Sequence, residues 1–213
     1  VLLFFVIGDS LTVKVSPAAV ALMGAALSML VSHQSRVDTV ENILRDVDWS
    51  TLIFFMSTFV LIGGLEKTGV IKSFAGILAV SIGTNIVFGS IVLVFVVGIL
   101  SSIVPNIPLV VAMIPLLKQY LVNVGLVGTE VLTPDFQGQL PPSVLPLFYA
   151  MLFGASLGGN GTLVGASSNI VAAGIAQQYG KRISFKGFLK YSIPVTILQL
   201  VAATIYLLIQ FFG

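Results

Sequence analysis

The sequence predicts an all-α membrane protein with several membrane-spanning helices. Of its 213 residues, 57% are hydrophobic and only 8% are charged, whereas soluble domains carry about a quarter charged residues. Several uncharged stretches approach the roughly 20 residues that span a bilayer core. Ten Lys and Arg with eight Asp and Glu cannot cover a water-facing surface of this size. We therefore expect a polytopic helical bundle, integral to the plasma or inner membrane.

The same composition excludes several functional classes. A net charge of +2 from ten scattered cations forms no stripe along phosphates, so no nucleic acid is expected as a partner. Without Cys, the chain has no disulfide, thiolate metal site or cysteine nucleophile. It lacks an HExxH motif and a phosphate-loop lysine. His33, its one histidine, lies in a charged segment that is expected to be a solvated loop. We expect neither an enzyme, nor a metal site, nor a resident cofactor.

The chain begins inside an apolar stretch. Residues 1–8 are apolar, with no initiator Met and no basic residues of a signal peptide. They resemble the tail of a membrane helix, and we expect one piece of a longer polypeptide. After a polar segment, Ser16 can cap and Pro17 can start a helix that runs to about Ser32.

Two amphipathic segments follow. Apolar residues recur at helical spacing between the charges of residues 33–48, which predicts a short surface helix. Asp48 is expected to cap the next helix, which begins at the interfacial aromatic Trp49 and is closed by Gly63 and Gly64. Residues 65–82 place Glu and Lys on an apolar helical pattern, which favours a helix lying in the membrane surface.

A first helix break is predicted by paired prolines. The apolar run 86–103 meets Pro105-Asn106-Ile107-Pro108 and then continues. Two prolines three residues apart cannot both sit inside a regular helix. Asn106 is a suitable N-cap for the restarting helix, with Pro108 in its first turn. We predict a helical hairpin over 86–120, with its tip near mid-membrane.

A second break is predicted within residues 144–179, after a polar loop over 122–143. About 35 uncharged residues would make a straight helix of roughly 50 Å, longer than the ~30 Å bilayer core. The centre, 158–169, reads GGNGTLVGASSN, which disfavours continuous helix. If the segment crosses the membrane once as a broken helix, six Lys and Arg lie on one side of the membrane and four on the other. If it turns back as a hairpin, the division is eight against two. The positive-inside rule prefers the hairpin.

The two breaks form the expected binding site. Backbone groups freed at membrane depth must be satisfied by protein, water or ligand, and interrupted helices mark binding sites near the midplane of transporters. Restarting helices direct positive dipole ends at anions, whereas ending helices offer carbonyls to cations. We expect the amides of both breaks to share one polar cavity. The candidate ion-binding residues are Ser101, Ser102, Asn106, Asn160, Gly161, Thr162, Ser167, Ser168 and Asn169.

The glycines also allow a simpler interpretation. Gly154 and Gly158, and again Gly161 and Gly165, have the GxxxG spacing that lets membrane helices pack closely. If packing is their whole role, the chain is a non-transporting membrane subunit. An intramembrane enzyme, the third possibility, would need a charged pair at membrane depth, and the sequence offers none.

Three motifs follow one another along the chain: DVDWSTLIFF with FVLIGGLEKTG over 46–69, SSIVPNIP over 101–108, and LGGNGTLVGASSN over 157–169. In this order they resemble the C-terminal half of the ion transporter superfamily. The similar branch contains arsenite permeases, NhaD-type sodium/proton antiporters and the melanosomal P protein. Relatives often have an aspartate where Pro105 stands, so the resemblance implies no cation or proton role for this position.

The resemblance implies one of two inverted repeats. Scaffold helices would fill 1–64, an interfacial arm helix 65–82, and a transport region 83–213, in which a re-entrant hairpin over 86–120 precedes a broken helix over 144–179 and a last helix over 188–212. A single broken crossing is thereby favoured over the second hairpin.

The implied function is secondary active transport by alternating access. The cargo would be an anion or oxyanion, such as arsenite or a carboxylate, or the protein would exchange sodium for protons. A coupling Na+ or H+ would serve in place of a cofactor. The expected partners are the small ion, the lipid bilayer, and the other repeat, supplied by an N-terminal segment or another subunit; a homodimer is compatible with this arrangement.

Overall fold

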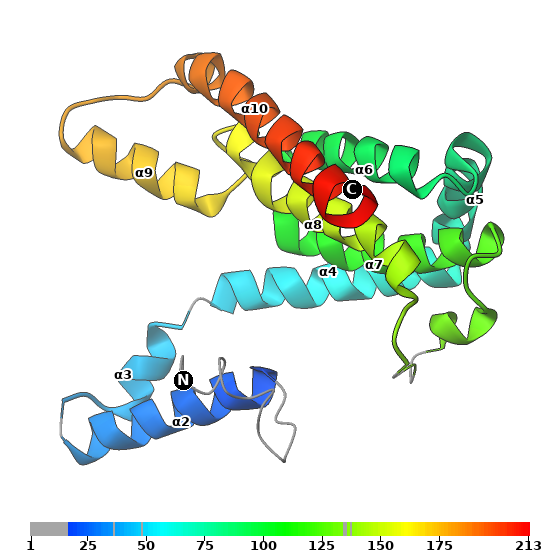
Figure 1. The fold of residues 1–213 in the computed structure, drawn as a ribbon. Coiled ribbons are helices and arrows are strands. Elements are labelled where there is room, and N and C mark those ends of the chain that lie inside the picture. The colour runs from blue at the N-terminus through cyan, green and yellow to red at the C-terminus, as the bar shows by residue number, and fades with distance from the viewer. Residues whose placement is uncertain (1–16, 36, 48, 134–135, 137) are drawn as a thin grey trace. The chain divides into compact units, whose positions relative to one another are not determined.

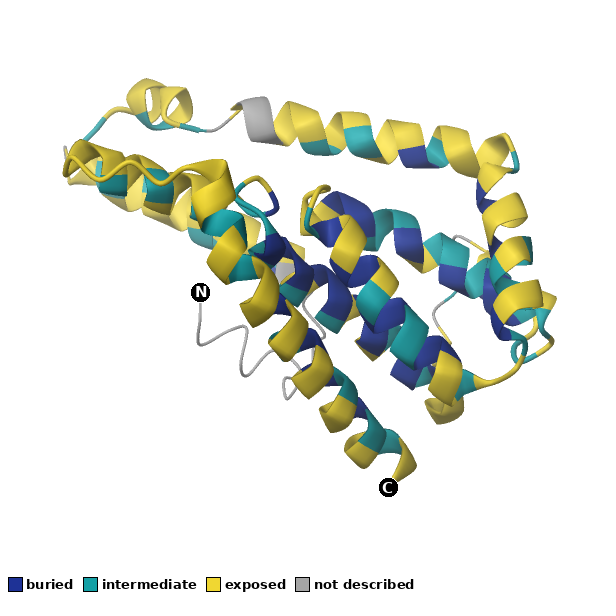
Figure 2. Ribbon diagram, turned by 90° about the horizontal axis from the view of Figure 1, so that it is seen from above, coloured by how far each residue is buried: buried dark blue, intermediate teal, exposed yellow. Residues whose placement is uncertain are grey.

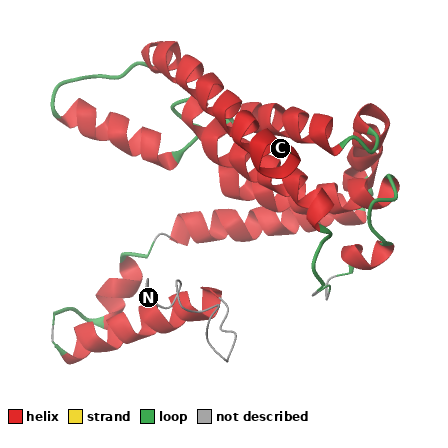
Figure 3. Ribbon diagram, viewed as in Figure 1, coloured by secondary structure: helices red, strands yellow, loops and turns green. Residues whose placement is uncertain are grey.

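A computed structural model describes residues 17–35, 37–47, 49–133, 136 and 138–213. In these ranges the regular structure is helical, without strands, which confirms the predicted all-α class (Figure 3). The chain divides into two compact units, Val1–Ile53 and Phe54–Gly213. The apolar octapeptide and the caps expected at Ser16 and Asp48 lie outside the described residues.

The first unit contains α2 (Pro17–Gln34) and α3 (Val40–Arg45). Helix α2 starts at its proline as predicted, but it extends past Ser32 and takes His33 into its last turn, so the expected loop position of this histidine is wrong. The surface helix predicted over 33–48 is reduced to the six residues of α3. Thr39 caps its start, because the Thr39 hydroxyl accepts the backbone N–H of Asn42 at 3.3 Å.

Gly63 and Gly64 do not end the next helix, contrary to the prediction. Helix α4 runs from Trp49 to Lys67, because apolar surroundings keep backbone hydrogen bonds inside a helix despite the poor propensity of glycine. The chain turns at Gly69, which has φ +78°, a conformation that glycine adopts without strain. Helix α5 (Val70–Ile82) then begins at an angle of 69° to α4. Of the helix predicted over 65–82, only the second part, Val70–Ile82, forms the separate helix α5. The first residues of that range belong to the end of α4.

The rest of the second unit is built on five helices: α6 (Ile86–Ser101), α7 (Asn106–Asn123), α8 (Leu145–Gly158), α9 (Ser167–Gln178) and α10 (Phe185–Phe212). Short 3-10 turns occupy Thr129–Leu132 (η2), Pro142–Val144 (η3) and Gly159–Gly161 (η4). Helix α8 lies beside α6, α7 and α10 (Figure 1). The buried residues concentrate on these packed faces (Figure 2). The core includes Leu93, Val97, Leu117, Leu147 and Leu200.

Both predicted breaks are present. Helix α6 ends at Ser101 and α7 begins at Asn106, while 162–166 separate η4 from α9. Asn106 is the first residue of α7 and not its N-cap, a position that Pro105 takes. Because it already lies inside the helix, the Asn106 side chain reaches only the next residue and accepts the backbone N–H of Ile107 at 2.9 Å. Pro108 lies in the first turn, as expected.

Several of these helices are long enough for a membrane. Among the described residues, three helices could each cross a bilayer by length and composition: α7, the continuous stretch Pro142–Gly161 made of η3, α8 and η4, and α10. The bent pair α4 and α5 could form one more span. The apolar helical stretches Ala18–Gln34 in α2 and Ile86–Ser101 in α6 are shorter. These helices fit an integral, multi-pass membrane protein.

The hairpin over 86–120 can be tested by cysteine labelling, since the chain has no native Cys. Thr84→Cys and Thr129→Cys place thiols at exposed positions just outside α6 and α7. We expect a membrane-impermeant maleimide to label both from the same side. Val104→Cys, at the tip, should resist labelling from the opposite side, because a re-entrant tip stops inside the membrane. Thr84 and Thr129 labelled from opposite sides, or a tip labelled freely from the far side, would contradict the hairpin.

Candidate functional site

The end of α6 lies unusually close to the end of α8. A Cβ added to Gly158 would stand 2.2 Å from the backbone oxygen of Gly98, and one added to Gly154 would stand 2.7 Å from the oxygen of Val94. Only hydrogen atoms fit at these two points, so the GxxxG pair on α8 does pack against α6. The contact brings the two breaks together at one end of the helix pair.

Two serines join these helix ends. Ser101 is fully buried, and its hydroxyl donates to the backbone oxygen of Ala155 on α8. The Ser102 hydroxyl lies 2.9 Å from the oxygen of Gly158 and 3.1 Å from that of Gly98, so its proton can serve either carbonyl. Ala155 and Gly158 lie in the last turn of α8, where carbonyls commonly lack an intrahelical partner, and the serine side chains at the end of α6 supply donors to them.

The loop formed by η4 and residues 162–166 folds over Ser102. The Thr162 hydroxyl donates to the backbone oxygen of Ser102, and the N–H of Gly165 donates back to this hydroxyl at 3.0 Å. The side-chain amide of Asn169 donates to the oxygens of Gly159 at 3.1 Å and Thr162 at 2.9 Å. Asn169 therefore fixes the shape of the loop from the first turn of α9.

Helix α10 supports the same loop from the other side. The Ser192 hydroxyl donates to the oxygen of Gly161 at 2.8 Å, and the Asn160 amide donates to Oε1 of Gln199 at 3.1 Å. Each of these bonds joins residues more than thirty positions apart in the sequence. The loop is thus held by α6, α9 and α10 together.

The first turns of α7 and α9 open into one hollow of about 360 Å³. Neither helix has a side-chain cap: Pro105 and Ala166 occupy the two N-cap positions. The positive ends of both helices face the hollow, and at α7 the side-chain oxygen of Asn106 engages one first-turn N–H, that of Ile107. Its lining residues are Pro105, Asn106, Val164, Gly165, Ala166, Ser167, Ser168 and Ile170.

The amides of the two breaks do not share this hollow, contrary to the expectation. Asn106 lines it, whereas Asn160 and Asn169 line a separate hollow of about 640 Å³ beside the start of α10. The reason is their hydrogen bonding, because both amides are already engaged in holding the loop and turn away from Asn106. Ser167 and Ser168 are exposed and line the same hollow as Asn106.

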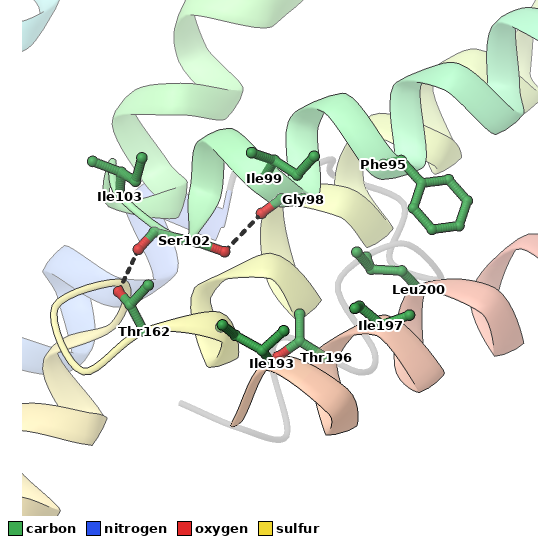
Figure 4. Close-up of a pocket in the computed structure, with 11 residues that line it drawn as sticks. Phe95, Gly98, Ile99, Ser102, Ile103, Thr162, Ile193, Thr196, Ile197 and Leu200 are labelled. Carbon is green, nitrogen blue, oxygen red and sulfur yellow. Dashed lines mark hydrogen bonds between the residues drawn. The ribbon is translucent and has the colours of Figure 1, made fainter. Parts of the chain in front are cut away.

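A third hollow, of about 490 Å³, lies between α6 and α10 and is almost entirely apolar (Figure 4). Ser102, Gly161 and Thr162 form its end next to the loop. Thr196 on α10 is 5% exposed, and its hydroxyl has no hydrogen-bond partner in the structure. In the described ranges, no three His, Asp or Glu side chains gather into a possible metal site.

Comparison with known proteins identifies the family. A family model described as a citrate transporter matches residues 1–133, more than half of the chain. The chain belongs to the citrate transporter family. This membership places it among transporter families and not among enzymes, and it confirms the resemblance to the ion transporter superfamily. The match ends before the second break, which therefore lies outside the matched residues.

Individual proteins similar to this citrate transporter family member include further transporters. An uncharacterized transporter of Synechocystis sp. is 69% identical over 206 residues, covering 97% of the chain and 46% of that protein. An uncharacterized transporter of Mycobacterium tuberculosis is 35% identical, covering 93% and 42%. The P protein of Homo sapiens is 34% identical, covering 89% and 21%. The chain thus spans less than half the length of these relatives. No solved structure matches it.

In this citrate transporter family member, α10 contributes hydrogen bonds to the loop that were not predicted from the sequence. Ser192 and Gln199 were not among the predicted site residues, although both bind the loop. The signal was available: Ser192, Thr196 and Gln199 follow at intervals of four and three residues, which places them on one face of an otherwise apolar helix. A polar stripe on a membrane helix indicates a partner in the protein interior.

Proposed function

We propose that the complete protein is a secondary active transporter of a small carboxylate anion, working by alternating access around the two breaks. The observation that carries this proposal is the pair of uncapped helix starts, α7 and α9, that open into one hollow. The positive end of a helix stabilises a nearby anion by about 0.3–1 kcal/mol at an exposed position, and by more where water is excluded. Two such ends suit a carboxylate or another oxyanion.

Neutral hydrogen-bonding groups complete the proposed site. Asn106, Ser167 and Ser168 surround the hollow with amide and hydroxyl groups, which can bind carboxylate oxygens and still release them. The family description, citrate transporter, agrees with a carboxylate. Arsenite or another oxyanion would meet the same groups.

Sodium/proton exchange is the weaker candidate for this part of the protein. It would need a carboxylate that gains and loses a proton at membrane depth. No Asp or Glu follows Asp135 in the sequence, and Pro105 and Asn106 form the tip of the first break. A coupling Na+ or H+ stays part of the proposal, because secondary transport needs an ion gradient to drive it.

Reconstituted transport tests the proposal. The complete polypeptide should be placed in proteoliposomes, and uptake of labelled citrate, succinate, arsenite and chloride measured with imposed Na+ or H+ gradients. We expect gradient-dependent uptake of a carboxylate, and competition among carboxylates but not by chloride. Protein-free vesicles provide the control. Sodium/proton exchange without movement of any carboxylate would refute the carboxylate proposal.

A further inference from the structure

The hollow beside the start of α10 has a chemistry of its own. It is the largest of the three cavities around the second break, at about 640 Å³. The loop contributes Asn160 and α9 contributes Asn169, while the connection from α9 to α10 contributes Arg182. The first turns of α10 complete it with Ser184, Gly187, Phe188, Tyr191, Ser192 and Val195.

The C-terminal part of the chain carries basic side chains and no acidic ones. Residues 136–213 contain Lys181, Arg182, Lys186 and Lys190, but no Asp or Glu. Arg182 is exposed, and it is the one charged residue among those that line the hollow. A guanidinium in a hollow with amides and hydroxyls, and without a competing carboxylate, offers the geometry that binds carboxylates through two parallel hydrogen bonds.

We propose that this hollow is a vestibule that binds a multiply charged carboxylate through Arg182 before the anion reaches the breaks. The inference rests on the proposed carboxylate transport and deepens it, because it assigns a residue that selects the substrate's charge. Asn160 links the two sites, since it lines the vestibule and belongs to the loop that closes over Ser102. Asn160 donates one amide hydrogen to Gln199 and the Ser184 hydroxyl accepts the N–H of Gly187, so the second amide hydrogen of Asn160 and the hydroxyl hydrogen of Ser184 are donors for a second carboxylate group on the anion.

The competing role for these cations is the binding of anionic lipid headgroups. Juxtamembrane Lys and Arg commonly do so on the cytoplasmic side of a membrane. Lys181, Lys186 and Lys190 are exposed and do not line the hollow. Lys186 therefore provides a matched control: Lys186→Gln removes the same charge from the same region and leaves the lining unchanged.

The test measures citrate binding and citrate transport separately. Binding is measured by titration calorimetry on the purified complete polypeptide, in detergent without lipid. Uptake is measured in neutral and in anionic vesicles. We expect Arg182→Gln to weaken citrate binding and to raise KM for citrate about tenfold, which corresponds to about 1.4 kcal/mol. Acetate, with one carboxylate, should show a smaller change. Arg182→Lys should restore part of the affinity, and Lys186→Gln should behave as the unmodified protein.

Each remaining outcome decides the matter. Equal citrate affinity in Arg182→Gln and the unmodified protein would overturn the vestibule, and so would equal losses in Arg182→Gln and Lys186→Gln. Effects that occur only in anionic vesicles would assign the cations to lipid headgroups. Failure of the unmodified protein to bind citrate also overturns it. Absence of carboxylate uptake with intact, Arg182-dependent citrate binding would instead refute the transport proposal alone.

Discussion

Replacing Gly158 with leucine is expected to prevent stable folding of the second unit, with a loss of more than about 3 kcal/mol in the free energy of unfolding. A Cβ at this position would stand 2.2 Å from the oxygen and 2.6 Å from the Cα of Gly98. These are backbone atoms, so no change of rotamer relieves the clash, and α6 and α8 must separate. Thermal unfolding of the detergent-purified protein, followed by size-exclusion chromatography, measures the effect.

Gly174 provides the matched control for this substitution. It lies in α9, and a Cβ there would meet no atom within 4 Å. Gly174→Leu should therefore leave the melting temperature close to that of the unmodified protein. If Gly158→Leu were equally stable, the close packing of α6 against α8 would be wrong.

Replacing Asn169 with leucine is expected to reduce transport about a hundredfold while the protein stays folded. The change removes the hydrogen bonds to the oxygens of Gly159 and Thr162. A buried carbonyl left without a partner costs about 1–3 kcal/mol, so the loop shape over Ser102 becomes a minor conformation. The packing of α6 against α8 does not involve Asn169, and we expect its melting temperature to fall by less than about 5 °C.

Two further asparagines separate the roles of loop shape and ligand binding. Asn123→Leu, at the exposed end of α7, should transport normally, since its amide oxygen accepts only from Gln119. Asn106→Leu should raise KM without loss of stability, because this exposed side chain lines the hollow and holds no part of the loop. Retained transport in both Asn106→Leu and Asn169→Leu would remove the breaks from consideration and favour glycines that serve packing alone.

The elements that the sequence predicts well are those set by local chemistry. The paired prolines end α6 near Ser101, and the glycine-rich segment interrupts 144–179, because two prolines or several glycines close together disfavour helix, whereas the single Pro115 and Pro194 lie inside α7 and α10. The prediction that Gly63 and Gly64 end a helix was wrong, since this one pair of glycines lies in an otherwise apolar segment and stays helical within α4. The actual turn at Gly69 depends on a single left-handed residue, which composition does not distinguish.

The sequence predicts several residues of the candidate site but not their hydrogen-bond partners. Ser101, Ser102, Thr162 and Asn169 do meet, yet mainly as donors to carbonyl oxygens of the two breaks. Such pairing depends on which helices lie side by side, and this follows from the backbone approach that Gly158 permits. For the same reason the sequence could not show that Asn106 and Asn160 face different hollows.

The close packing at Gly98 restricts sliding of α6 along its neighbouring helices in the second unit. A Cβ there would stand 2.8 Å from Cδ1 of Leu200 on α10, and the backbone of Gly158 presses on the same residue from α8. Sliding α6 by one residue would bring a Val or Ile side chain to a point that has no room for it. Because shear between these helices is resisted, we expect α6, α8 and α10 to move together during transport. The positive-φ glycines in the connections between helices, Gly69, Gly83, Gly125 and Gly180, are where we expect the backbone to bend.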